Sequence, residues 1–134
     1  MRILVTGDKG YIGTVMVPLL IQEGYTVTGL DSDWFEQSAF SELPVKVVSR
    51  KKDLRDLEAS ELEGFDAVIH LAGLSNDPLG DLNPSLTYDI NHAASVRLAK
   101  LAKKAGVSRF LFSSSCSTYG AAGPDRTGGP RGDG

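Results

Sequence analysis

Short apolar runs alternate with longer amphipathic segments along the chain, up to about residue 113. A short apolar run bounded by glycine or polar residues is typical of a buried strand in a parallel sheet. Apolar residues at every third or fourth position are typical of a helix with one buried face. The predicted strands are residues 2–6, 25–30, 45–49, 66–72 and 109–113, and the predicted helices are 11–23, a short one within 54–62, and 84–105.

This alternation predicts an α/β fold, namely a Rossmann-type doubly wound parallel sheet with helices on both faces and right-handed crossovers. About five strands in the order 3-2-1-4-5 are expected. Pro18 lies inside the first predicted helix and is expected to bend it or weaken one turn. No internal repeat is visible, and no substrate domain is expected within these residues.

The composition changes after Tyr119. Eight of the fifteen residues 120–134 are Gly or Pro, and the only apolar side chains among them are two alanines. Such a segment buries too little surface to offset the entropy lost on ordering. The expected organisation is therefore a nucleotide-binding domain over residues 1–119 and a disordered tail over 120–134.

Length and charge restrict the possible partners. The 134 residues suffice for one domain, and their formal net charge of −3 disfavours nucleic acid as a partner. A single cysteine, Cys116, excludes an intramolecular disulfide and favours a reducing compartment. The longest later apolar run, 15–21, is too short to span a membrane. We therefore expect a cytoplasmic protein without membrane contact, and we predict no metal site.

The strongest motif is the glycine spacing Gly7-x-x-Gly10-x-x-Gly13, between the first predicted strand and the first predicted helix. In a dinucleotide site the first glycine allows a tight turn, the second allows the backbone to approach a pyrophosphate, and the third allows close packing of helix and strand. The helix N-terminus then offers N–H groups to the phosphates. The alternative is a purely structural glycine turn.

Asp31 ends the second predicted strand, 18 residues beyond Gly13. A carboxylate at that point can accept hydrogen bonds from the adenosine ribose hydroxyls and repels a 2′-phosphate. This favours NAD over NADP, and neither Ser32 nor Asp33 supplies an arginine for such a phosphate. The cationic Lys9 in the glycine loop argues against this preference for NAD. The alternative interpretation of Asp31 is an ordinary loop carboxylate without a role in binding.

Five motifs occur in one order along residues 1–120 and together resemble a known family. They are Thr6-Gly7-x-x-Gly10-Tyr11-Ile12-Gly13, Asp53-Leu54-Arg55-Asp56, His70-Leu71-Ala72-Gly73, Asn91, and the serine run from Ser113 to Gly120. The family is the extended short-chain dehydrogenases/reductases, and within it the NAD-dependent epimerase/dehydratase group that acts on nucleotide sugars. The resemblance implies NAD as cofactor and a nucleotide sugar as substrate. A homo-oligomer is also expected, because the fifth predicted strand is left as a sheet edge and unpaired edges tend to associate.

The resemblance also implies roles for individual residues. Ser115 matches the catalytic hydroxyl that hydrogen-bonds the substrate oxygen. In the cofactor site, the resemblance implies contacts to the pyrophosphate from Gly7, Gly10, Tyr11, Ile12 and Gly13, to the adenosine ribose from Asp31, and to the adenine from Asp53 and Leu54. It implies that Leu71, Ala72 and Gly73 line the cofactor past the fourth strand, that Asn91 in the long helix supports the active-site end, and that Ser113 and Ser114 lie beside the nicotinamide ribose.

Structural interpretations stay open for several of these residues. Asp53 can instead cap the following short helix, and Asn91 can be a satisfied buried amide. His70 is interpreted as a histidine at the edge of the core, because its strand is apolar. His92 is expected on a helix surface, and Cys116 is expected to serve only in packing.

The family's reaction needs a tyrosine and, four residues later, a lysine that lowers the tyrosine's pKa. Four residues after the four tyrosines come Val15, Gly29, His92 and Gly123, so this pair is absent from the 134 residues. We therefore expect the cofactor half of a truncated or short enzyme, inactive alone. The alternatives are a non-catalytic NAD-binding regulatory or assembly module and, more remotely, an S-adenosylmethionine methyltransferase.

Overall fold

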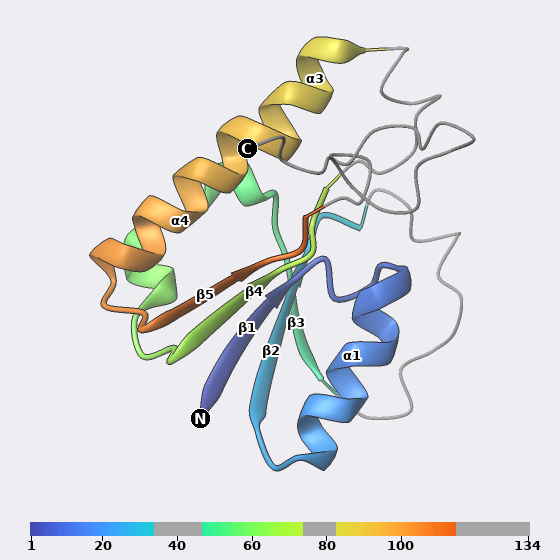
Figure 1. Cartoon of the computed structure of the whole chain (residues 1–134), viewed down its shortest axis with the longest axis vertical. Helices are drawn as coiled ribbons and strands as arrows, with labels where there is room; N and C mark the ends of the chain where they lie inside the picture. The colour runs from blue at the N-terminus through green and yellow to red at the C-terminus, as the bar shows by residue number, and fades with distance from the viewer. Residues whose placement is uncertain (34–46, 74–82, 115–134) are drawn as a thin grey trace, which may run out of the picture.

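Five parallel strands form one sheet in the order β3-β2-β1-β4-β5, which confirms the predicted Rossmann arrangement (Figure 1). The computed structural model describes residues 1–33, 47–73 and 83–114. The strands are β1 (Arg2–Thr6), β2 (Thr26–Asp31), β3 (Val48–Lys51), β4 (Ala67–His70) and β5 (Arg109–Phe112). The short tail predicted for 120–134 lies outside the described residues.

Helices cover the two faces of this sheet (Figure 1). One face carries α1 (Tyr11–Gln22), which continues as one helix through Pro18. The opposite face carries α4 (Ala94–Lys104), together with the 3₁₀ turns η2 (Leu54–Asp56) and η3 (Ala59–Leu62). The short helix α3 (Pro84–Tyr88) and a π-helical turn (Asp89–Ala93) lead into α4.

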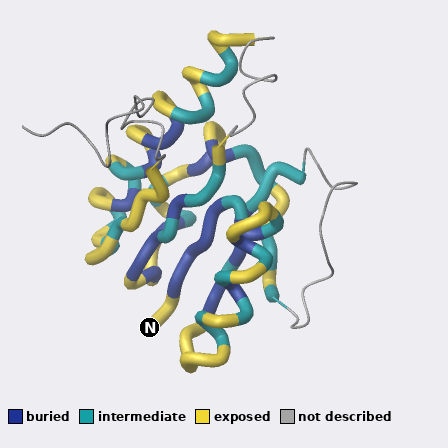
Figure 2. Tube along the Cα trace, turned by 45° about the vertical axis from the view of Figure 1, so that its right-hand side comes forward, coloured by how far each residue is buried: buried dark blue, intermediate teal, exposed yellow. Residues whose placement is uncertain are grey.

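The central strand β1 shows why these residues form a sheet with two buried faces. Ile3 and Val5 join Val17 of α1 in one apolar cluster. Leu4, between them, joins the larger cluster on the α4 face. Successive side chains of a strand point to opposite faces, so an unbroken apolar run is needed where both faces are covered. Figure 2 shows this strand almost entirely buried.

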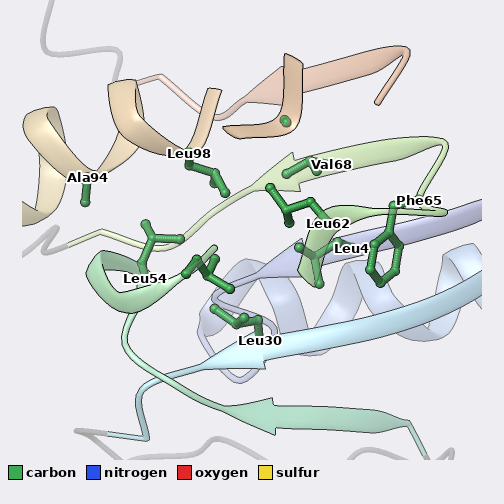
Figure 3. Packing of buried hydrophobic residues seen from close by; sticks show 10 residues of the cluster. Leu4, Leu30, Leu54, Leu62, Phe65, Val68, Ala94 and Leu98 are labelled. Carbon is green, nitrogen blue, oxygen red and sulfur yellow. The ribbon is translucent and has the colours of Figure 1, made fainter. Parts of the chain in front are cut away.

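The larger cluster fixes α4 against the sheet. Leu98 of α4 points into the cluster that also contains Val68 of β4 and Leu62 of η3 (Figure 3). Its other buried members are Leu4, Leu30, Leu54, Leu57, Phe65, Ala94 and Ala102. This packing holds the carboxyl ends of β1, β2 and β4 in fixed relation, which matters for the site described next.

The strand bounds other than those of β3 differ from the predicted ones by at most two residues, and the structure corrects two predictions further. The third strand was expected at 45–49, but the ladder with β2 runs from Val48 to Lys51. β3 is an edge strand, so polar residues such as Arg50 can belong to it, and the apolar pattern places it too early. The single helix expected at 84–105 contains the π-helical turn 89–93, which an apolar repeat does not reveal.

Within the described residues, no helix has the length and apolarity that a bilayer-spanning segment requires.

Candidate cofactor site

The glycine loop between β1 and α1 is held tightly by the ends of neighbouring strands. Gly7 has φ 74°, and its N–H donates to the Leu30 carbonyl oxygen at 2.8 Å. A Cβ on Gly7 would lie 2.8 Å from the backbone nitrogen of Ala72. A Cβ on Gly13 would collide with the carbonyl oxygens of Gly7 and Asp8. Both positions therefore require glycine, as the spacing predicted.

Gly10 differs from the other two glycines because the interior does not require it. Among the described residues, a Cβ there would meet the Gly7 carbonyl oxygen alone, at 3.3 Å, and the residue is exposed. Gly10 is also the N-cap of α1, and no side chain in the described part of the chain caps that helix. The first turn of a helix has N–H groups without helical partners and a positive dipole end. The loop and helix start thus fit an anionic group such as a pyrophosphate.

Asp31, the last residue of β2, connects the glycine loop to the segment after β2. Its carboxylate accepts the Lys9 N–H at 3.3 Å and the Asp33 N–H at 2.9 Å. The residue is half-buried, and its carbonyl oxygen continues the β2–β3 ladder by accepting from the Lys52 N–H at 2.9 Å. A carboxylate so fixed beside the glycine loop can accept hydrogen bonds from ribose hydroxyls.

Asp8 is a fully buried carboxyl group beneath the same loop, and sequence reasoning gave it no role. It packs over Gly29 of β2, where a Cβ would collide with it, and beside Ser49 of β3. No donor within the described residues completes a hydrogen bond to either of its oxygens. Burial raises the pKa of Asp8, and the nearby Asp31 adds to the effect while Ser49 opposes it.

Asp53 and Leu54 lie two and three residues beyond β3. The Asp53 carboxylate caps η2 by accepting the Arg55 N–H at 2.9 Å and pairs with the Arg55 guanidinium at 2.7 Å. The Arg55 hydrogen bonds lower the pKa of Asp53. Asp53 therefore caps the following short helix. Leu54 is buried in the core cluster on the α4 side of the sheet.

His70 is buried at the end of β4, as the apolar strand predicted, and both ring nitrogens are hydrogen-bonded. Nδ1 lies 2.6 Å from Thr6 Oγ1, and Nε2 lies 2.7 Å from Ser95 Oγ. Ser95 donates its proton to the Asn91 carbonyl oxygen at 2.8 Å. Ser95 must then accept from Nε2–H, and Thr6 must donate to Nδ1. Burial lowers the pKa of His70 to about 4, so the ring is neutral.

This chain of hydrogen bonds ends at Asn91, in the π-helical turn. The Asn91 Oδ1 would lie 3.1 Å from a Cβ on Gly73, so the helix approaches the segment after β4 closely. Leu71 and Ala72 continue from β4, and the Leu71 N–H donates to the Thr6 carbonyl oxygen at 3.0 Å. Chains of buried hydrogen bonds of this kind fix the relative position of the elements they join.

The carboxyl edge of the sheet thus gathers most of the predicted site residues. Gly7, Asp31, Asp53 and Ala72 follow or end four neighbouring strands, as predicted. Ser113 and Ser114 follow β5 and are exposed, and the Ser113 N–H donates to the His70 carbonyl oxygen at 3.1 Å. Tyr11 and Ile12 are exposed at the start of α1. The predicted catalytic Ser115 and Cys116 lie outside the described residues.

Comparison with known proteins agrees with this arrangement. Residues 3–131 match the model of the NAD dependent epimerase/dehydratase family. UDP-glucose 4-epimerase 1 of Oryza sativa subsp. japonica is 36% identical over 131 residues, which cover 88% of this chain and 37% of that protein. A UDP-glucose 4-epimerase sequence of Klebsiella pneumoniae is 32% identical, and the match covers 90% of this chain and 93% of that sequence.

A solved structure shows the same fold. The crystal structure of UDP-glucose-4-epimerase from Stenotrophomonas maltophila, with bound NAD and formylated UDP-arabinopyranose, matches with a TM-score of 0.78 and 30% sequence identity. The match covers 90% of this chain and 38% of that one. The chain thus spans little more than a third of this structure and of the Oryza relative.

Proposed function

The chain belongs to the NAD-dependent epimerase/dehydratase family, and from this premise we propose that it binds NAD as the cofactor-binding part of a nucleotide-sugar enzyme. The observation that carries the proposal is the glycine loop. Its first glycine, Gly7, packs against Leu30 and Ala72, whereas Gly10 and the N-terminus of α1 are exposed. Asp31 beside the loop supplies the ribose acceptor. The family leaves the methyltransferase alternative without support.

Different residues along the carboxyl edge are proposed to bind different parts of NAD. Gly10 and the first turn of α1 receive the pyrophosphate, and Asp31 accepts the adenosine ribose hydroxyls. Asp53 lies toward the adenine, although Arg55 already occupies part of its carboxylate. The segment Leu71–Gly73, propped by Asn91, lines the cofactor. Ser113 and Ser114, which follow β5, are proposed to contact the nicotinamide ribose, and Ser115 is proposed to supply the catalytic hydroxyl. NAD itself accepts and returns a hydride in such enzymes.

The substrate class rests on the relatives. The Oryza protein is a UDP-glucose 4-epimerase, and the Stenotrophomonas enzyme holds a UDP-sugar beside NAD. Since the 134 residues contain no Tyr-x-x-x-Lys pair, they lack the acid–base group for a sugar hydroxyl. By themselves they are proposed to bind NAD without turning over a sugar nucleotide. An NAD-binding regulatory or assembly module is the second candidate, because the glycine loop and Asp31 fit binding of NAD by themselves.

Isothermal titration of the purified chain with NAD and NADP tests the proposal. NAD should bind preferentially, and Gly10→Val should abolish binding because the branched side chain fills the open side of the loop. Asp31→Ala should weaken binding by about tenfold, as loss of hydrogen bonds to a charged group predicts. Glu23→Ala, which removes an exposed carboxylate just beyond the far end of α1, is the matched control. Absence of binding by the folded wild type would refute the proposal.

A further inference from the structure

We propose that Asp33 determines the cofactor preference of this chain, because it pairs with Lys9 and Lys51 and so withholds their charge from the phosphate that distinguishes NADP from NAD. The inference rests on the NAD binding proposed above and names the residue that sets its selectivity. None of the roles assigned along the edge involves Asp33. Asp33 belongs to a charged cluster around the end of β2.

The geometry of this cluster centres on Asp33, two residues beyond the end of β2. Its side chain is only 5% exposed, and its carboxylate lies 2.5 Å from Lys9 Nζ and 3.8 Å from Lys51 Nζ. Its backbone N–H donates to Asp31 at 2.9 Å, and the Lys9 N–H donates to the other oxygen of Asp31 at 3.3 Å. Lys9 and Asp33 are therefore joined both through Asp31 and by their own ion pair.

Pairing with Asp33 prevents Lys9 from acting as a binding group for a 2′-phosphate. In a Rossmann site the acidic residue ending the second strand binds the ribose 2′-hydroxyl, and a cation nearby accommodates a 2′-phosphate. Lys9 is such a cation by position, since its backbone contacts Asp31. Its hydrogen bond to Asp33 raises the pKa of Lys9, so the ammonium stays charged and paired. Among the described residues of this cluster, a 2′-phosphate would meet the carboxylates of Asp31 and Asp33 while the ammonium of Lys9 is already paired.

The backbone of Asp33 decides which substitution is informative. Asp33 has φ 56°, in the left-handed region that Asn and Asp tolerate better than most residues. Asp33→Asn keeps that preference and the size of the side chain while it removes the charge. The variant should therefore fold as the wild type does and release Lys9. Any change in cofactor preference can then be assigned to the lost ion pairs.

Titration of the full chain with NAD and, separately, NADP measures the effect. Wild type should prefer NAD, and Asp33→Asn should tighten NADP binding by about tenfold, the gain expected from one charge-assisted contact to phosphate. Adding Lys9→Ala to Asp33→Asn should remove that gain. Raising the salt concentration should reduce it, because the new contact is exposed. Glu61→Gln is the matched control, since it weakens the comparable but separate Glu61–Lys52 pair at 2.7 Å.

Each outcome decides the inference. An unchanged preference in Asp33→Asn, with NAD still bound, would overturn it and leave the proposed function standing. A folded wild type that binds neither dinucleotide would overturn both. The double variant Asp33→Asn/Lys9→Ala decides whether Lys9 carries the gain, because it removes one negative and one positive charge together. Its ratio of NADP to NAD affinity should return to within about twofold of the wild-type ratio, and NADP binding that stays as tight as in Asp33→Asn alone would contradict the inference.

Discussion

Two buried titratable side chains, His70 and Asp8, lie beside the carboxyl edge and respond to pH in opposite ways. His70 has a hydrogen-bond partner on each ring nitrogen, whereas Asp8 has none for either oxygen among the described residues. The apolar strand predicted the burial of His70 but not its partners, which come from residues 64 positions earlier and 25 positions later. Asp8 was not predicted, because the glycine spacing says nothing of residues between the glycines.

His70 should make the fold sensitive to mild acid. Its pKa falls from 6.5 to about 4 on folding, so the unfolded chain binds a proton between these values and the folded chain does not. Stability is fully present above pH 6.5 and is lost as pH falls toward 4, by at most about 3 kcal/mol. Urea unfolding at pH 7 and pH 5 measures this loss. His70→Asn should lower stability overall and flatten its slope over that interval, and an unchanged slope would contradict the assignment.

In contrast to the effect of His70, ionisation of Asp8 should destabilise the fold as pH rises. Its pKa is raised above 3.8 by burial, so its ionisation at neutral pH opposes folding, and that penalty appears as pH rises through the folded-state pKa. Asp8→Asn should therefore stabilise the chain at pH 7 by about 1 kcal/mol, with less gain near pH 4. Thermal unfolding at the two pH values tests this. Destabilisation at pH 7 would mean that the carboxylate has a favourable partner in solution.

At the scale of elements, β2 and the glycine loop pack as one unit. Asp8 from the loop covers Gly29 in the centre of β2, and Gly7 donates to Leu30 next to it. The alternation of strands and helices was predictable because both faces of β1 and β4 are apolar. The π-helical turn and the two 3₁₀ turns were not, since local hydrogen-bond pattern rather than side-chain spacing determines them.

Gly29→Ala should therefore destabilise the chain, because its Cβ collides with the Asp8 carboxyl group. Overpacking of this kind costs about 1–3 kcal/mol. Combining it with Asp8→Ala, which removes that carboxyl group, should restore much of the loss. Chemical unfolding of the two single variants and the double variant forms a double-mutant cycle. Additive effects would show that the two positions do not contact one another.

At the scale of the whole molecule, the two edges of the described sheet differ. β3 carries polar residues, whereas β5 exposes Leu111 at 50% and Phe112 at 55%. The expected order of strands followed from parallel crossovers, which leave few topologies. The sequence could not predict which edge strand exposes apolar side chains, because buried and exposed apolar strands have similar sequence patterns.

An apolar edge strand tends to associate, so the chain is expected to form a homo-oligomer through β5. Leu111→Lys should shift sedimentation toward the monomer because it places a charge in the contact. Val48→Lys, on the exposed position of the opposite edge strand, is the control and should leave the distribution unchanged. A wild type that is monomeric at high concentration, or an equal response of both variants, would contradict this expectation.

The most direct test of the central claim is to map NAD binding by amide chemical shifts in the isotope-labelled chain. Addition of NAD should shift the amides of Gly10 to Gly13, Asp31 and Ala72, which line the carboxyl edge, and leave those of Glu23 and Gly106 at the opposite end unchanged. Shifts concentrated away from the glycine loop, or no shifts at millimolar NAD in a folded chain, would contradict NAD binding at this edge.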